Sequence, residues 1–131
     1  MIIGVPSEVK NNEFRVGLTP NSVQTIVSEG HSVYVQDGAG SNIGFSNNAY
    51  TNAGAQILMT AAEIYKIAEL VIKVKEPIES EYQFLRDDLT LFTYLHLAGD
   101  LENAKTLIAT GATGISYETV TSDDGSMPLL A

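Results

Sequence analysis

The sequence predicts an α/β fold built on an open, mostly parallel β-sheet with helices on both faces. Two observations support this prediction: short apolar runs alternate with segments of helical period along most of the chain, and some of these runs are apolar throughout. An unbroken apolar run is typical of a strand covered on both faces, and strands alternating with helices form right-handed βαβ units. A length of 131 residues suits a single domain, residues 1–131.

The strands are predicted from runs rich in Val, Ile and Leu. The first run, MIIGV, opens the chain, and Pro77 follows the fourth. The predicted strands are residues 1–5, 31–35, 55–58, 70–74, 89–95 and 113–116. A turn sequence at 123–125 indicates a small C-terminal hairpin. This order of elements predicts a Rossmann-like or flavodoxin-like domain.

The helices are predicted from their start and stop signals. Side-chain caps and glycine stops are the signals used. The predicted caps are Thr19, Ser46, Thr60 and Asp100, and the predicted stops are Gly30, Gly54 and Gly111. Thr60 and Glu63 have the spacing of a capping box, in which each side chain bonds the other's backbone N–H. Residues 78–85 are weakly helical.

The composition excludes several classes of function. A formal net charge of -9 argues against binding to nucleic acid or to anionic membranes, because nothing would neutralise the phosphates. The chain has no cysteine, which fits a reducing compartment. It shows neither a signal peptide nor an apolar run of membrane-spanning length. We therefore expect a cytoplasmic protein.

Three ionisable side chains follow predicted strands. Arg15 lies in the loop after the first strand, Lys75 follows the fourth and His96 the fifth. The carboxyl ends of parallel strands meet at one edge, where ligands bind. A guanidinium can bind a carboxylate through two parallel hydrogen bonds, an ammonium can polarise a carbonyl, and an imidazole can transfer protons near neutral pH. The trio thus suits a small oxo or amino acid.

Each of these residues also has an ordinary structural interpretation. Arginine is mostly a solvated surface charge, a lysine after a strand often protects a sheet edge, and a histidine beside leucines often has a structural role. Their shared placement favours the functional interpretation.

No cofactor or metal site is predicted within the chain. The segment GAGSNIG, residues 38–44, resembles a dinucleotide fingerprint, but its third glycine is one residue late and a poor helix former follows. It is interpreted as a plain glycine-rich loop. His31 and His96 are far apart in the sequence, and no metal-binding pattern accompanies either.

The motifs together resemble a known family. MIIGVPSEVKNNEFRVGLTP, VIKVKEP and TYLHLAGD, in this order and spacing, resemble the N-terminal domain of alanine dehydrogenase. The related nicotinamide nucleotide transhydrogenase shares the opening pattern from Glu8 to Pro20, but is understood to lack the lysine and histidine that stand here at Lys75 and His96.

The resemblance implies an NAD-dependent oxidoreductase that converts L-alanine reversibly to pyruvate and ammonia. It implies that Arg15 and Lys75 bind the substrate and that His96, with Lys75, is catalytic. It also implies that NAD binds mainly to a second, Rossmann domain absent from this chain, that the full-length protein is a homo-oligomer, and that the 131-residue chain alone is inactive. The ending MPLLA, at 127–131, suggests the front part of a longer protein. Two alternatives remain: a transhydrogenase-like domain and a non-catalytic module that binds small carboxylates.

Overall fold

The computed structural model describes residues 1–95 and 101–117. Six parallel strands form one sheet in the order β3-β2-β1-β4-β5-β6. The strands are β1 (Ile2–Val5), β2 (Ser32–Gln36), β3 (Gln56–Leu58), β4 (Leu70–Lys75), β5 (Thr90–Tyr94) and β6 (Thr113–Ser116). The predicted sheet is confirmed, and no strand begins or ends more than one residue from its predicted position.

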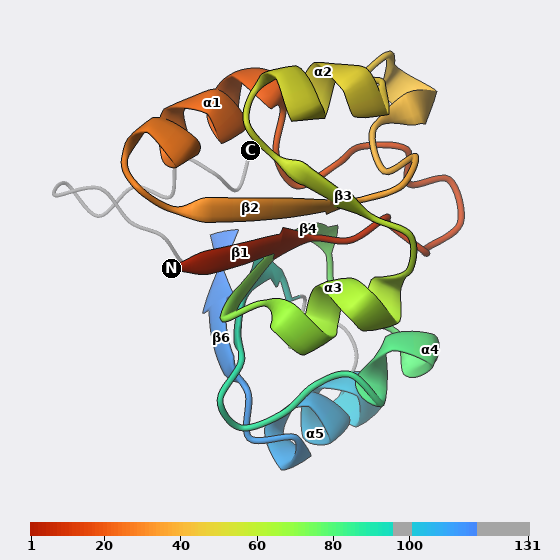
Figure 1. Cartoon of the computed structure of the whole chain (residues 1–131). Helices are drawn as coiled ribbons and strands as arrows, with labels where there is room; N and C mark the ends of the chain where they lie inside the picture. The colour runs from red at the N-terminus through yellow and green to blue at the C-terminus, as the bar shows by residue number, and fades with distance from the viewer. Residues whose placement is uncertain (96–100, 118–131) are drawn as a thin grey trace, which may run out of the picture.

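Helices cover both faces of the sheet, as predicted. The helical elements are α1 (Pro20–Ser28), η1 (Ser41–Ile43), α2 (Asn47–Asn52), α3 (Ala61–Ile67), α4 (Glu79–Tyr82) and α5 (Leu101–Ala109). Figure 1 shows α1 and α2 above the strands and α3, α4 and α5 below them. None of the helices in the described ranges has the length and apolar character needed to cross a bilayer.

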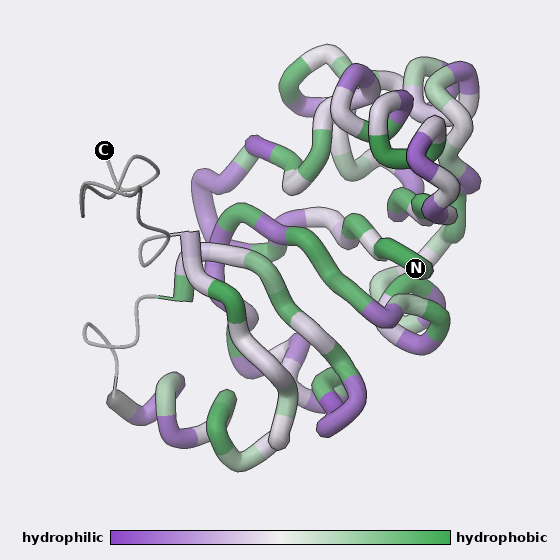
Figure 2. The backbone as a smooth tube through the Cα atoms, turned by 90° about the vertical axis from the view of Figure 1, so that its left-hand side faces the viewer, coloured by the Kyte–Doolittle hydropathy of each residue, from purple (hydrophilic) through white to green (hydrophobic). Residues whose placement is uncertain are grey.

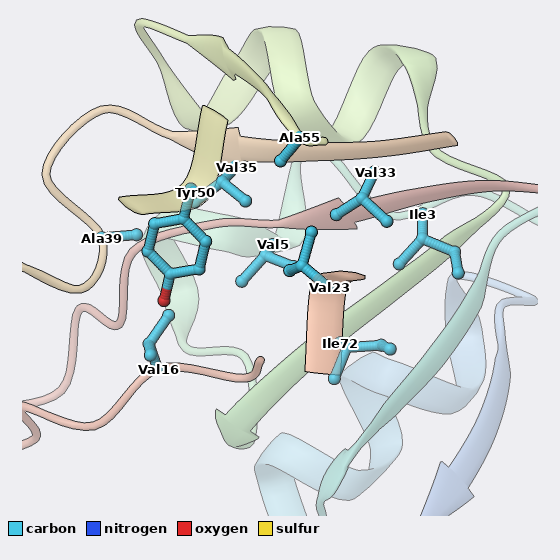
Figure 3. Close-up of a cluster of buried hydrophobic side chains, with 10 residues drawn as sticks. All are labelled: Ile3, Val5, Val16, Val23, Val33, Val35, Ala39, Tyr50, Ala55 and Ile72. Atoms are coloured by element: carbon cyan, nitrogen blue, oxygen red, sulfur yellow. The ribbon is translucent and has the colours of Figure 1, made fainter. Parts of the chain in front are cut away.

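Two apolar clusters hold these layers together. The first lies under α1 and α2, where Val23 and Tyr50 pack on Val5, Val33 and Val35 (Figure 3). The second lies on the opposite face and contains residues of α3, β4, β5 and α5. Figure 2 shows hydrophobic residues concentrated along the central strands. Burial on both faces explains why these strands read as apolar runs.

The predicted helix caps are largely confirmed. The side chains of Thr19, Ser46 and Thr60 each accept a hydrogen bond from the backbone N–H three residues later. The three glycine stops have positive φ angles of 97°, 105° and 77°, a conformation that glycine adopts without strain. They are Gly30, Gly54 and Gly111.

The capping box is only half present. Glu63 N donates to Thr60 Oγ1 at 3.2 Å, but the Thr60 hydroxyl itself donates to the Glu63 carboxylate at 3.0 Å. A hydroxyl can donate and accept at once, so a side-chain pair takes the place of the second backbone bond. The predicted cap at Asp100, the turn at 123–125 and the segment 127–131 lie outside the described residues.

Candidate active site at the carboxyl edge of the sheet

The strand order reverses between β1 and β4. β1 pairs with β2 on one side and with β4 on the other, so the chain winds outward in both directions from this pair. In open parallel sheets the loops at such a switch point separate and leave room for a ligand. The loop after β1 carries Arg15, and β4 ends at Lys75. Two of the three predicted residues therefore lie at the switch point.

The loop between β1 and α1, residues 6–19, is fastened to the sheet. Ser7 N donates to Gln36 Oε1 at 2.9 Å, and the Tyr50 hydroxyl donates to Leu18 O at 2.7 Å. Figure 3 shows the Tyr50 hydroxyl pointing toward Val16 of the same loop. At Gly17 a Cβ would lie 2.4 Å from the carbonyl oxygen of Ile72, so only glycine allows this approach to β4. These contacts set the position of Arg15.

Arg15 forms an ion pair with Glu13 inside this loop. Its Nε and Nη2 donate to the two Glu13 carboxylate oxygens at 2.9 and 2.8 Å. The Glu13 side chain is 5% exposed, whereas that of Arg15 is 60% exposed. The second guanidinium edge, Nη1 with the remaining Nη2 hydrogen, bonds to no residue that the structure describes. This edge can bind a carboxylate from outside the loop.

Both Arg15 and Lys75 lower the pKa of Glu13. Hydrogen bonding from Arg15 lowers the pKa of the Glu13 carboxyl below its ordinary value, and the nearby ammonium of Lys75 lowers it further. The same pairing raises the pKa of Arg15. Tyr94, which pairs with Lys75 across β4 and β5, also raises the pKa of Arg15.

The third predicted residue, His96, lies outside the described residues. Its chain neighbour Leu95 follows β5 directly and is buried. The structure therefore brings Arg15 and Lys75 to one edge, and the place of His96 remains a prediction from the sequence.

A buried charged cluster beside β4 was missed by the sequence prediction. Lys73, 1% exposed, lies 3.4 Å from Glu8 Oε1 and 3.1 Å from Glu81 Oε2. The Tyr65 hydroxyl donates to Glu81 Oε2 at 2.9 Å, and burial, aided by the Glu81 charge, raises the pKa of Tyr65 well above 10. A lysine inside a strand covered on both faces was the available signal, because lysine is almost never buried without a partner.

The glycine-rich loop does not fit a dinucleotide. It holds only the one-turn helix η1, and the helix α2 that follows has six residues. A Cβ at Gly40 would lie 2.7 Å from Phe45 Cβ and 2.9 Å from the Tyr50 ring, so this glycine permits packing. Within the described ranges, no three His, Cys, Asp or Glu side chains gather as metal ligands would.

An apolar cavity of about 170 Å³ lies elsewhere, between α5 and strands β5 and β6. No charged side chain lines it, and neither Arg15 nor Lys75 reaches it. We attach no chemistry to this cavity, because a polar ligand needs convergent polar groups.

A doubly wound parallel α/β domain with cations at its switch point belongs to the class of domains that bind small ligands at the carboxyl edge. The chain belongs to the family described as alanine dehydrogenase/PNT, N-terminal domain, whose model matches residues 4–131. The family predicted from the sequence motifs is thereby confirmed.

Individual relatives support the same assignment. The chain is 52% identical over 130 residues to an alanine dehydrogenase of Bacillus subtilis, which covers 99% of this chain and 34% of the relative. It superposes on an L-alanine dehydrogenase structure with a TM-score of 0.95, at 48% identity, covering 99% of this chain and 36% of that one. A transhydrogenase from Sinorhizobium meliloti is more distant, with a TM-score of 0.83 and 27% identity over 90% of this chain and 35% of that one. The chain thus spans about a third of the length of these relatives.

Proposed function

We propose that this chain is the substrate-binding N-terminal domain of an NAD-dependent alanine dehydrogenase. In this proposal the complete enzyme converts L-alanine reversibly to pyruvate and ammonia. The observation that carries the proposal is the position of Arg15 and Lys75 at the switch point of the sheet, in a chain about half identical to alanine dehydrogenases. The lower identity of 27% to a transhydrogenase favours the dehydrogenase within the family.

The proposed roles follow from the chemistry of each group. Arg15 binds the carboxylate of alanine or pyruvate through the guanidinium edge that Glu13 leaves open. Lys75, at the end of β4, donates to the carbonyl oxygen of pyruvate and stabilises the negative charge that develops there. His96 is the general acid/base, moving protons to and from the attacking water and the carbinolamine. Holding the substrate in one orientation supplies much of the rate increase.

The cofactor is assigned to another part of the enzyme. NAD serves as the oxidant of alanine in this reaction, and the glycine-rich loop leads into a six-residue helix in place of the longer helix whose amino terminus usually binds a pyrophosphate. We therefore propose that a second domain holds NAD and that the 131-residue chain alone is inactive. We also propose that the full-length protein is a homo-oligomer and works in the cytoplasm.

The test uses the two histidines of this chain in the protein expressed from its complete reading frame. His96→Ala is expected to lower kcat for alanine deamination by about a hundredfold or more, the scale of lost general acid/base catalysis. The matched control is His31→Ala, because His31 is exposed and contacts the chain's amino terminus at the opposite edge of the sheet.

We expect the control to keep near-normal turnover. Near-normal turnover in His96→Ala would remove this residue from the mechanism. A wild-type protein that turns over neither alanine nor pyruvate with NAD would contradict the proposed function, and pyruvate binding without turnover would favour the binding-module alternative.

A further inference from the structure

The end of β4 extends beyond its neighbour β1. The pairing of these strands joins Ile3 to Leu70 and Gly4 to Val71, and β1 ends at Val5 while β4 continues to Lys75. The last backbone N–H groups of β4 therefore need acceptors from another source, because a buried donor without a partner is costly.

The Glu8 carboxylate supplies these acceptors. Val74 N donates to Glu8 Oε2 at 3.1 Å, and Lys75 N donates to Glu8 Oε1 at 2.9 Å. Successive N–H groups of a regular strand point to opposite sides, so one carboxylate can bind both only where the strand is irregular. The pairing of β4 with β5 does shift in register between Ile72 and Lys75.

Glu8 is itself held in place. Its side chain is 2% exposed, and Lys73 Nζ lies 3.4 Å from its Oε1. Lys73 is held in turn by Glu81, which also accepts from the Ile78 backbone N–H at 3.2 Å. A carboxylate that accepts from two backbone donors and faces an ammonium has little freedom to move.

We propose that Glu8 is a positioning residue for the reaction. It fixes the irregular end of β4, and with it the direction of the Lys75 ammonium. Glu8 also belongs to the loop that carries Arg15, so its carboxylate joins this loop to the end of β4 that carries Lys75. This inference rests on the proposed function, since it concerns pyruvate bound between Arg15 and Lys75.

The test is Glu8→Gln in the protein expressed from its complete reading frame. The amide turns a donor toward a backbone N–H and removes the charge facing Lys73, so the end of β4 should shift. We expect KM for pyruvate to rise about tenfold or more and kcat/KM to fall about a hundredfold, with KM for NADH within about twofold. A merely structural role would lower the amount of active enzyme and leave KM for pyruvate unchanged.

The matched control is Glu69→Gln. Glu69 Oε1 also accepts a strand backbone N–H, that of Ile2 at 2.7 Å, but at the opposite edge of the same strand pair. The control is expected to keep the wild-type KM. If Glu8→Gln does not fold, Glu8→Asp tests the same contact, since its carboxylate is one methylene too short to reach both donors, and it should show the same rise in KM.

An unchanged KM for pyruvate in the folded Glu8 variant, or an equal rise in Glu69→Gln, would overturn the inference alone. A wild-type protein without alanine or pyruvate turnover would overturn the proposed function and this inference together.

Discussion

At the scale of single residues, Arg15 uses only one edge of its guanidinium within the described part of the chain. The Glu13 carboxylate binds Nε and Nη2, which holds the planar group in one orientation. A cation held in this way loses less conformational entropy when a second carboxylate binds. Under the proposed function, Glu13 therefore orients Arg15 for a substrate carboxylate and does not merely neutralise it.

The first prediction concerns Arg15→Lys in the complete enzyme. Lysine keeps the charge but has no planar fork, so it cannot bind Glu13 and a substrate carboxylate bidentately at once. We expect KM for pyruvate to rise about tenfold or more, with a smaller change in kcat, measured by steady-state kinetics.

The control for this prediction is Arg86→Lys, the same substitution at the other arginine of the chain. Arg86 donates to Tyr65 O and Ala68 O at the end of α3, on the amino side of the sheet. It is expected to lower stability without changing KM. An unchanged KM for pyruvate in Arg15→Lys would remove Arg15 from the site.

The sequence predicted that two cations would lie at the carboxyl edge of the sheet, but not which residues hold them there. Arg15 and Lys75 could be found because a parallel sheet gathers its carboxyl ends at one edge. The contact of Glu8 with Lys75 depends on how far β4 extends beyond the end of β1. This depends on the pairing register of the two strands, which exists only in the folded sheet. Lys73 could have been recognised as buried, but its partner Glu81 comes from α4, a helix with weak sequence signals.

At the scale of elements, α2 packs against the loop before α1 and holds this loop in place. α2 lies on the face of the sheet opposite α3 (Figure 1). Tyr50 of α2 is completely buried, and its hydroxyl donates to the carbonyl of Leu18. Burial raises the pKa of Tyr50 to about 12. The phenol is therefore neutral in the folded protein at every pH at which the fold is normally studied.

The second prediction is the alkaline dependence of stability in Tyr50→Phe. The pKa is raised from an ordinary value of about 10 to about 12 in the folded state. The contribution of the neutral Tyr50 phenol to the free energy of unfolding is therefore complete below pH 10. It is lost as the pH rises toward 12. At neutral pH the variant should be less stable by about 1 kcal/mol through the lost hydrogen bond.

Unfolding measured at a series of pH values checks this prediction. The difference in free energy of unfolding between the wild type and Tyr50→Phe should narrow above pH 10, because only the wild type loses the stabilisation from this phenol. If the free energies of unfolding of the two proteins change in parallel through the alkaline range, the prediction is contradicted.

Start and stop signals located the elements well, while irregularities within elements were not predicted. A cap or a glycine stop depends on a few neighbouring residues, so Thr19 and Gly30 are readable locally. The register shift in β4 coincides with the Glu8 contact, which joins residues distant in sequence. The Thr60–Glu63 pair is local, but its hydroxyl takes one of two equivalent hydrogen-bonding options that the sequence does not distinguish.

At the scale of the whole molecule, the sheet order places one reversal in the chain and one candidate site at it. β1 and β4 pair there, and the loop after β1 approaches β4 at Gly17. Regular alternation of strands and helices predicts a parallel sheet, but the order of the strands depends on the side to which each crossover turns. That choice is made by the packing of α1 and α2 on one face and α3 and α5 on the other.

The most direct test of the account is a crystal structure of the complete enzyme with NADH and pyruvate bound. We expect the pyruvate carboxylate within hydrogen-bonding distance of the Arg15 guanidinium edge opposite Glu13, and its carbonyl oxygen within the same reach of Lys75 Nζ. Pyruvate bound at another edge of the sheet, out of reach of both cations, would contradict the central claim.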